Sequence, residues 1–353
     1  MAGRLARAGQ SYTLLEASDR LANSWAQHYD RLHLHTIKQY SALPHRPFPP
    51  YYPTYVSKHD LLRYYQDYAA HFGIEPIYNA EVISAKRRAK RWVVRTIKGT
   101  THQADQLIIC TGFNRVPHRP TWPGEAEFQG AIAHSRTYKN SKPYVGQPTL
   151  VIGMGNTGAE VALDLSEAGV PTYLSVRGPI NIVPRDFRGR PVQRTAKLIR
   201  RLPNRLGDWI GNRVQAAAIG DLRTYGIETP AESPARQLRE RAKTPVIDLG
   251  TVAAIRAGRI QVVPDISRFV PEGVALADGR KLQVQRVILA TGYRTGLTDW
   301  LSVPTGVLNE RAIPNSAVTS YGLYFVGFDA YASGLLDSIY RDSERVLRAI
   351  MST

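Results

Sequence analysis

The glycine pattern at residues 153–158, Gly-Met-Gly-Asn-Thr-Gly, constrains the fold more than any other feature of this sequence. It has the GxGxxG spacing, directly follows the apolar run Thr149–Ile152 and opens a helical pattern over residues 159–168. In such a unit the first glycine permits a tight turn, the second lets the backbone approach a pyrophosphate, and the third lets the helix pack on the strand. The alternative is a glycine-rich structural turn, but the flanking strand and helix favour a dinucleotide site. The residues that we assign to this site are Gly153, Gly155, Asn156, Thr157 and Gly158.

The residue at the end of the next strand indicates which dinucleotide binds. Residues 172–176 have the character of a strand, and Arg177 follows them. At this position a carboxylate bonds the ribose hydroxyls of NAD, whereas an arginine suits the 2′-phosphate of NADP. The alternative is that Arg177 is only a surface charge. We expect this unit to bind NADPH.

A second, partial unit of the same kind stands at the start of the sequence. Residues 1–9 have a helical pattern, and residues 12–16 read as a short strand that ends in Glu16. An acid at this position bonds the adenosine ribose of a cofactor without a 2′-phosphate, and FAD fits that description. A solvated strand end is the alternative for Glu16. One unit that ends in an acid and one that ends in an arginine imply two different nucleotides, the layout of a flavoprotein reduced by NADPH.

The remaining patterns predict an α/β fold with two Rossmann-like dinucleotide-binding domains. A helix is expected over residues 57–73, with Ser57 as its N-cap and Gly73 at its end. A second long helix is expected near the C-terminus, over residues 334–350. The segments that read as strands are 80–86, 91–97, 107–110, 149–152, 249–255, 260–263, 273–277, 286–290 and 323–328.

Composition excludes several classes of protein. The formal net charge is +17, with basic clusters at residues 86–91 and 185–213, but no nucleic-acid-binding signature accompanies them, so we expect no nucleic-acid partner. The cluster at 86–91 is read as a solvated turn. The lone Cys110 forms neither an internal disulfide nor a CxxC pair, which argues against a thioredoxin-reductase type of enzyme. No apolar run approaches the roughly 20 residues of a membrane span, and a cytoplasmic location is the default expectation.

Residues 128–138 fit the pattern FxGxxxHxxxY, through Phe128, Gly130, His134 and Tyr138. This pattern resembles the identifying sequence of flavin-containing monooxygenases, in which it also lies just before the NADP glycine loop. Taken alone, His134 would more often be a structural histidine. The resemblance implies that His134 and Tyr138 are positioning groups at a domain junction rather than acid–base catalysts.

Other segments extend the resemblance over nearly the whole chain, with residues 185–245 matching least. Residues 18–35, Leu43-Pro44 and Phe48-Pro49 are similar to the flavin-side region of the YUCCA-like, N-hydroxylating branch of these class B flavoprotein monooxygenases. The family implies that Trp25 and Asn114 lie near the flavin, although in isolation Trp25 reads as a core residue and Asn114 as a turn residue. The paired turns between the domains and the last strand of the FAD domain add cofactor positions at Thr111, Gly112, Thr291, Gly292 and Gly327.

The resemblance implies an NADP domain, residues 145–285, inserted into a FAD domain formed by residues 1–144 and 286–353. It also implies an activity in which NADPH reduces FAD and a C4a-(hydro)peroxyflavin passes one oxygen atom from O₂ to a small organic substrate. No catalytic triad or metal site is expected. The class of substrate stays open among sulfur and nitrogen compounds, ketones and 2-oxo acids, and so does the oligomeric state.

The start of the sequence departs from the family pattern, because the first strand and the FAD glycine loop are missing. Either Met1 is an internal methionine of a longer natural protein, or the short chain is the product and binds FAD poorly. An NADPH oxidase or flavin reductase without oxygen transfer, and an inactive NADP-binding remnant, are therefore the rival functions. Weak association with a membrane surface is a further alternative, carried by the apolar residues Leu198, Ile199, Leu202, Leu206 and Ile210 among arginines.

Overall fold

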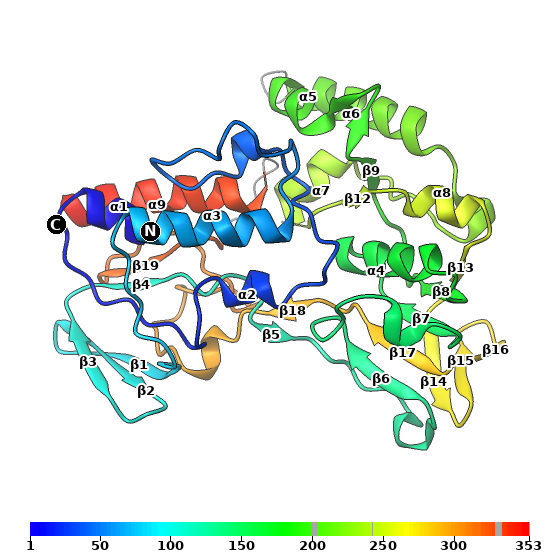
Figure 1. Ribbon diagram of the computed structural model, residues 1–353, viewed down its shortest axis with the longest axis horizontal. Coiled ribbons are helices and arrows are strands. Elements are labelled where there is room, and N and C mark those ends of the chain that lie inside the picture. The colour runs from blue at the N-terminus through cyan, green and yellow to red at the C-terminus, as the bar shows by residue number, and fades with distance from the viewer. Residues whose placement is uncertain (200–202, 242, 329–333, 353) are drawn as a thin grey trace. The chain divides into compact units, whose positions relative to one another are not determined.

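The computed structural model describes residues 1–199, 203–241, 243–328 and 334–352 (Figure 1). The chain forms two compact units and passes between them after Gln27, Arg31, Val116 and Gly292. Unit 1 consists of Met1–Gln27, Leu32–Val116 and Tyr293–Thr353, and unit 2 consists of His28–Arg31 and Pro117–Gly292. Within the described residues, no helix combines the length and the apolar character that crossing a membrane requires.

Unit 2 is built on a parallel sheet whose strands have the order β13-β8-β7-β17-β6. The strands are β6 (Ala131–His134), β7 (Thr149–Ile152), β8 (Thr172–Ser175), β13 (Ile260–Val263) and β17 (Arg286–Leu289). Every residue of β7 is buried, as expected for a central strand covered on both faces. The strand expected at residues 149–152 and the helix after it are confirmed, although helix α4 (Asn156–Glu167) begins three residues earlier than its apolar pattern.

Helices and a small antiparallel sheet cover the parallel sheet of unit 2 (Figure 1). Helices α4 and α8 (Thr251–Arg256) pack together and against β8 and β13. Phe269 and Val274 of the antiparallel sheet share a buried cluster with Leu150, Ile152 and Val287 of the parallel sheet. The antiparallel strands are β14 (Ile266–Val270), β15 (Gly273–Leu276) and β16 (Lys281–Gln283).

The strand expected over residues 249–255 is wrong, because this segment forms helix α8. The side chain of Asp248 accepts the backbone N–H groups of Gly250 and Val252, at 3.3 and 3.0 Å, and so caps the first turn. Gly250 adopts a φ of +126°, a conformation that L side chains rarely take. Thr251 then donates its hydroxyl to the carbonyl of Ala159 in α4, at 3.0 Å. The capping signal was present in the sequence and outweighs the apolar run.

The basic stretch from residue 185 to 245 is more ordered than its sequence suggests. Asn181 is buried and donates to the Glu232 carbonyl and to the Gln237 side chain, both at 3.0 Å, while Gln215 donates to Asn181 at 3.2 Å. The elements are β9 (Ile182–Pro184), β10 (Asp186–Phe187), β11 (Arg190–Pro191), α5 (Val192–Ile199), α6 (Asn204–Ile219), α7 (Pro234–Arg241) and β12 (Val246–Asp248). The buried amides fix the helices that carry Gln215 and Gln237, α6 and α7, to the parallel strand pair of β9 and β12.

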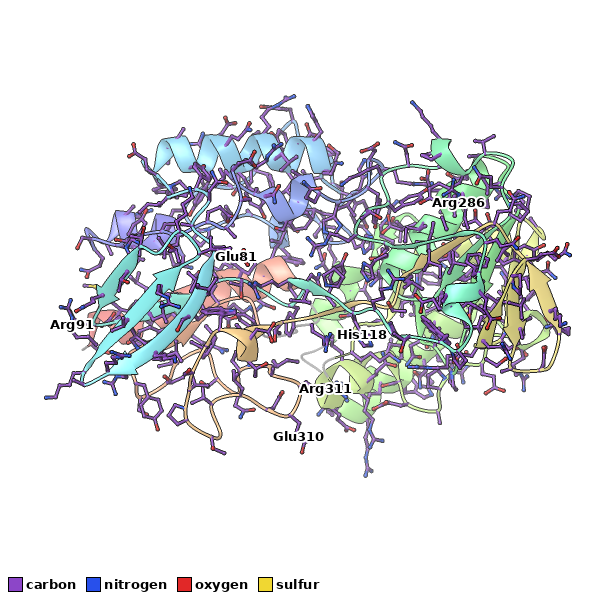
Figure 2. All side chains as sticks on the ribbon, turned by 90° about the horizontal axis from the view of Figure 1, so that it is seen from below. Glu81, Arg91, His118, Arg286, Glu310 and Arg311 are labelled. Carbon is purple, nitrogen blue, oxygen red and sulfur yellow. The ribbon has the colours of Figure 1, made fainter. Side chains whose placement is uncertain are left out.

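Unit 1 combines helices, a three-stranded antiparallel sheet and a short parallel pair. Ser57 caps α3 as expected, because its hydroxyl accepts the Asp60 N–H at 3.1 Å. Glu81 and Arg91 stand at opposite ends of the antiparallel sheet (Figure 2). Residues 86–91 are all exposed, as expected of a solvated turn, although only residues 89 and 90 lie outside the two strands. The helices are α1 (Ala2–Arg7), α2 (Asn23–Ala26), α3 (Lys58–His71) and α9 (Leu335–Met351), and the strands are β1 (Val82–Arg88), β2 (Arg91–Thr96), β3 (Thr101–Ala104), β4 (Leu107–Ile109) and β19 (Leu323–Phe325).

Two expectations differ from the structure in extent. The strand expected at residues 12–16 is reduced to a single parallel bridge between Leu15 and Ile77. Residues 117–144 and 286–292, which the sequence places in the FAD domain, pack with unit 2, because β6 and β17 are neighbouring strands of its parallel sheet. The short strands β5 (Val116–Pro117) and β18 (Tyr293–Arg294) stand where the chain passes between units.

Candidate functional site

The glycine loop before α4 gives its three glycines different roles. Gly153 has a φ of +99°, and a Cβ built on it would lie 2.9 Å from the carbonyl oxygen of Ala290. A Cβ on Gly158 would lie 1.9 Å from the carbonyl oxygen of Gly153, so this position tolerates no side chain. A Cβ on Gly155 would meet nothing within 4 Å, and its φ of −88° suits any residue. Packing therefore requires the first and third glycines, while the second faces open space where a ligand backbone can approach.

The first turn of α4 has the electrostatics of an anion site. It contains no acidic residue, and its N-cap is a glycine without a side chain to bond the first N–H groups. The Asn156 side chain is committed elsewhere, since it accepts the Ile247 N–H at 2.7 Å and donates to the Pro245 carbonyl at 3.4 Å. Asn156 thus holds β12 against α4, a structural contact that sequence reasoning missed, and Thr157 follows it half-buried.

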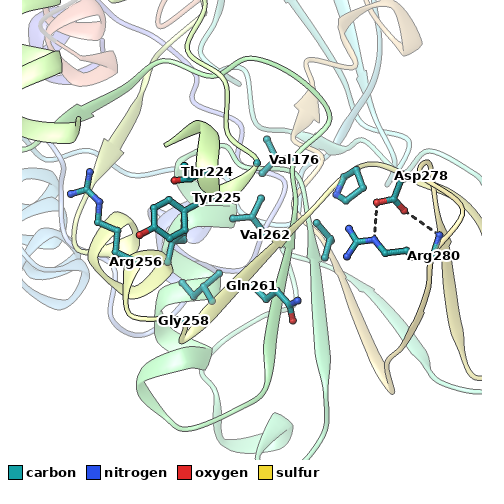
Figure 3. A pocket seen from close by; sticks show the side chains of 14 residues that line it. Val176, Thr224, Tyr225, Arg256, Gly258, Gln261, Val262, Asp278 and Arg280 are labelled. Atoms are coloured by element: carbon teal, nitrogen blue, oxygen red, sulfur yellow. Dashed lines mark hydrogen bonds and ion pairs between the residues drawn. The ribbon is translucent and has the colours of Figure 1, made fainter. Parts of the chain in front are cut away.

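Arg177 follows β8 and is exposed. Its neighbour Val176 lines a cleft of about 680 Å³ that runs along the outer edge of the sheet, where β13 is the last strand (Figure 3). Tyr225 and Arg256 line one side of this cleft, and the ion-paired Asp278 and Arg280 line the other. No sequence pattern predicted this cleft, because it arises where β13 lacks a further strand beside it.

The FxGxxxHxxxY segment attaches β6 to the turn after β17. Phe128 is buried against Phe269, with ring centroids 5.3 Å apart. A Cβ on Gly130 would lie 2.4 Å from the Gln285 carbonyl oxygen, so glycine is required there. His134 Nε2 bonds the carbonyl oxygen of Gly292 at 3.1 Å, and Gly292, with a φ of +85°, also accepts the His118 N–H at 2.9 Å. Thr291 completes the attachment, since its hydroxyl donates to the His118 carbonyl.

The contacts of His134 define its protonation. Its Nδ1 accepts the Arg136 N–H at 3.1 Å, so the proton of the neutral ring is on Nε2, which donates to Gly292. Burial lowers the pKa of His134 below its usual value, and the hydrogen bond to Gly292 opposes that effect only in part. A neutral histidine with both nitrogens engaged in hydrogen bonds is poorly suited to proton transfer.

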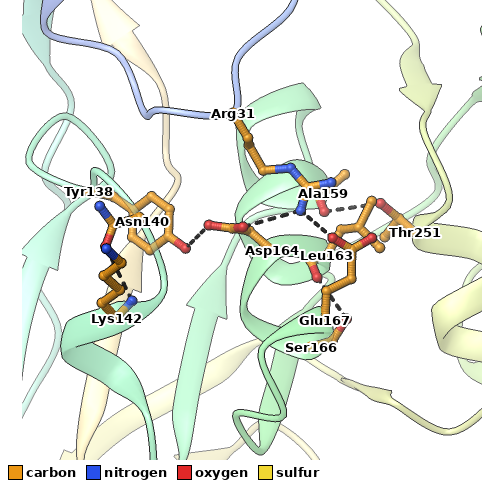
Figure 4. Close-up of polar contacts among 10 residues, drawn as sticks. All are labelled: Arg31, Tyr138, Asn140, Lys142, Ala159, Leu163, Asp164, Ser166, Glu167 and Thr251. Carbon is orange, nitrogen blue, oxygen red and sulfur yellow. Dashed lines mark hydrogen bonds and ion pairs between the residues drawn. The ribbon is translucent and has the colours of Figure 1, made fainter.

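The acidic face of α4 binds the short segment at residues 28–31 and the end of the motif (Figure 4). Tyr138, which is 2% exposed, donates to Asp164 at 2.5 Å, and Arg31 donates to the same carboxylate at 3.2 Å. Arg31 also pairs with Glu167 at 2.6 Å. Burial, and then the hydrogen bond to Asp164, raise the pKa of the Tyr138 hydroxyl far above its usual value.

One contact of this face is fully buried. Tyr29 donates its hydroxyl to Glu160 at 2.8 Å, and each residue is 3% exposed. Sequence reasoning identified neither this contact nor the bond between Tyr138 and Asp164. The available signal was the spacing of Glu160, Asp164 and Glu167, which places the three acids of this helix on one face.

The residues assigned to the flavin lie in unit 1 and at the turns that follow its strands. Glu16 accepts the N–H and the hydroxyl of Ser18, at 2.9 and 2.7 Å, directly after the bridge at Leu15. Trp25, in α2, packs against a buried cluster that includes Leu34 and Tyr64.

The turns after β4 and β19 lie at the same end of this strand pair, because the two strands are parallel. Gly112 has a φ of +68° with open space at its Cβ position, and Asn114 beyond it is exposed, as is Thr111. Gly327 has a φ of +85° and donates its N–H to Asp342 at 3.1 Å. The open space at Gly112 fits the close approach of a cofactor, whereas a Cβ on Gly327 would lie 2.9 Å from the Ile339 side chain.

Comparison with known proteins agrees with this geometry. The family described as "FMO-like: Flavin-binding monooxygenase-like" matches residues 9–300. The chain is 36% identical over 333 residues to "Indole-3-pyruvate monooxygenase YUCCA1" of Oryza sativa subsp. japonica, a match that covers 92% of this chain and 82% of that protein. It is 34% identical over 348 residues to "Indole-3-pyruvate monooxygenase YUCCA8" of Oryza sativa subsp. indica, covering 93% and 83%.

Solved structures share the fold at lower sequence identity. A flavin-containing monooxygenase from Stenotrophomonas maltophilia aligns with a TM-score of 0.72 at 21% identity, over 99% of this chain and 94% of that one. The open crystal structure of cyclohexanone monooxygenase aligns with a TM-score of 0.73 at 18% identity, over 99% and 84%. With the family match and relatives above 30% identity along most of its length, the chain belongs to the flavin-binding monooxygenase-like family and is an NADPH-dependent monooxygenase that uses FAD.

Proposed function

We propose that the protein oxygenates a 2-oxo acid with an aromatic side chain, of which indole-3-pyruvate is the leading candidate. The observation that carries the proposal is the 36% identity, along 92% of the chain, to a relative named as an indole-3-pyruvate monooxygenase. The balanced reaction consumes one 2-oxo acid, one O₂, one NADPH and one proton. It yields the carboxylic acid shortened by one carbon, CO₂, NADP⁺ and water.

In this proposal the described residues have separate tasks. The N-terminus of α4 and the open face at Gly155 hold the NADPH pyrophosphate, and Arg177 pairs with the 2′-phosphate. Glu16 and the turns at Gly112 and Gly327 hold FAD, which supplies hydride acceptance and oxygen activation when bound. In this proposal unit 2 is the NADP domain and unit 1 is the FAD domain, in place of the boundaries at residues 145 and 285 that the sequence predicts.

The motif residues are proposed to position these groups. His134 and Tyr138 fix the turn at Thr291-Gly292 and the face of α4, and neither hydrogen-bonding pattern leaves a group suited to proton transfer near neutral pH. We also propose a cytoplasmic location. The lone Cys110 supports it, because secreted proteins usually pair their cysteines in disulfides.

The test is a turnover assay with the purified chain, FAD, NADPH, indole-3-pyruvate and ¹⁸O₂. We expect NADPH consumption to match formation of the shortened acid carrying one ¹⁸O atom, with CO₂ released. Pyruvate, which lacks the ring, is the matched control substrate. Stoichiometric peroxide without oxygenated product would instead indicate an NADPH oxidase. NADPH binding without flavin uptake or turnover would indicate the nucleotide-binding remnant.

A further inference from the structure

Helix α6 presents an apolar and basic face that the proposed reaction does not use. Its opposite face is fixed to unit 2, since Gly207, Gln215 and Ile219 are buried and Gln215 bonds the buried Asn181. The side chains on the outer face lie three or four residues apart and therefore form one stripe. They are Arg205, Leu206, Trp209, Asn212 and Arg213, all exposed.

The exposed apolar side chains on this face are large. Trp209 is 56% exposed and Leu206 is 45% exposed, although tryptophan is highly buried on average. The guanidinium of Arg213 lies 5.1 Å from the centre of the Trp209 ring, so a cation flanks the indole directly. Indole, leucine and arginine side by side match the boundary between lipid headgroups and acyl chains, where tryptophan concentrates.

The charge around α6 is strongly positive. Residues 185–213 contain nine basic and two acidic residues, a net charge of +7. Both acids are paired within the protein, Asp186 with Arg185 at 3.1 Å and Asp208 with Arg239 at 2.8 Å. The acid on α6 therefore does not offset the arginines of the outer face.

We propose that the outer face of α6 docks the protein on a membrane surface that contains anionic lipids. The arginines would contact the headgroups, and Leu206 and Trp209 would insert at the level of the first acyl carbons. Nucleic acid offers the same negative charge but no apolar layer for Leu206. This inference does not depend on the proposed substrate. It places the apolar contact on Leu206 and Trp209, since Leu202 and the side chains of Leu198 and Ile199 lie outside the described residues.

The test is co-sedimentation of the full chain with vesicles of phosphatidylcholine, with or without phosphatidylserine. We expect binding only to the anionic vesicles, and release by salt. Arg205→Ala with Arg213→Ala should weaken binding about 25-fold, a factor of about five for each basic residue. The matched control is Arg88→Ala with Lys90→Ala, which removes the same charge from an exposed turn of unit 1 and should bind as the wild type does.

The apolar contribution has its own pair of variants. Trp209→Ser should weaken vesicle binding about tenfold. Tyr51→Ser changes a side chain that is 79% exposed elsewhere and should have no effect. Unchanged NADPH affinity and thermal stability will show that each variant is folded. Equal losses in both charge variants, unchanged binding of Trp209→Ser, or a chain that binds no vesicles and instead dimerises through Trp209, would each overturn the proposal.

Discussion

At the scale of single residues, the glycine loop gives the sharpest prediction, because two of its glycines should fail in different ways. Gly155→Val should leave thermal stability unchanged and abolish NADPH binding, since its Cβ points into open space that the pyrophosphate needs. Gly158→Ala should instead destabilise the protein by about 3 kcal/mol, because its Cβ overlaps the Gly153 carbonyl. Thermal unfolding and NADPH titration measure the two effects. NADPH binding by the valine variant would remove the basis for the nucleotide assignment.

Arg177 is predicted to select the phosphate of NADPH. Arg177→Ala should weaken NADPH about 30-fold and leave NADH nearly unchanged, because only NADPH carries the 2′-phosphate that the guanidinium would pair with. Fluorescence titration of both nucleotides measures the difference. Arg259→Ala is the matched control, because it removes the same charge elsewhere. Arg259 is exposed and precedes β13, at the opposite end of the sheet from Arg177. Equal weakening of NADPH and NADH would show that Arg177 is only a surface charge.

His134 is predicted to make stability depend on pH. Its pKa is lowered in the folded chain, so the unfolded chain takes up a proton at a higher pH than the folded chain does. The stability that neutral His134 contributes is complete above its unfolded pKa of about 6.5 and is lost as pH falls towards the lowered folded value. His134→Gln should therefore show a smaller fall in melting temperature between pH 8 and pH 5, both about one unit or more from that value.

His59→Gln is the control for this experiment, because the His59 side chain is 77% exposed and water screens its 4.0 Å contact with Asp60. It should retain the pH dependence of the wild type. His45, whose pKa is also lowered by burial, is unchanged in both variants and contributes equally to each curve. Identical slopes in the wild type and in His134→Gln would mean that His134 is not held neutral by its contacts.

At the scale of elements, the strands and helices with a clear period were predictable, and those set by capping or by distant partners were not. The short apolar run at Thr149–Ile152 predicted a buried strand, and all four residues are buried. Ser57 predicted the start of α3, because a serine hydroxyl can cap the first turn of a helix. Helix α8 was mistaken for a strand because Val252 and Ile255 resemble a β-rich run. What decides its structure is the cap from Asp248 and the left-handed Gly250.

The same distinction applies to the candidate site. The glycine roles follow from chain geometry alone, so the spacing was sufficient to assign them. The commitment of Asn156 to Ile247, and of Tyr138 to Asp164, depends on residues 91 and 26 positions away in sequence. No local pattern reports such pairs. The acids on α4 are a local signal of a polar contact, but they do not show that the partners are Tyr29 and Arg31.

The contact of Tyr29 with α4 yields a prediction at this scale. Tyr29→Phe should lower stability by about 2 kcal/mol, because it removes a hydroxyl donor from the buried carboxylate of Glu160. Adding Glu160→Gln should recover part of the loss, since a neutral amide costs less to bury than a carboxylate. Tyr51→Phe, at a 79% exposed side chain, is the control for losing a hydroxyl. Thermal unfolding without added nucleotide measures all four proteins, and an unaltered Tyr29→Phe would show that the contact is not stabilising.

At the scale of the whole molecule, two compact units with separate cores imply separate nucleotide sites. The core of unit 2 centres on Phe269 and the strands of the parallel sheet, while those of unit 1 include Trp92 and Tyr64. The net charge of +17 suits two anionic cofactors, because a positive field raises their local concentration around the protein. A ligand that binds only the folded form of one unit stabilises that unit by mass action.

Amide hydrogen exchange can therefore assign each cofactor to its unit. Saturating NADPH should slow exchange in peptides that cover residues 153–158 and 177, whereas FAD should slow exchange around Glu16 and residues 111–114, because bound ligand suppresses local opening. In Gly155→Val the NADPH effect should vanish while the FAD effect persists, which separates loss of one site from general unfolding. If NADPH protected the Glu16 segment and left the glycine loop unchanged, the assignment of the two nucleotides to the two units would be wrong. The control matters because a globally destabilised chain would lose protection in every peptide at once.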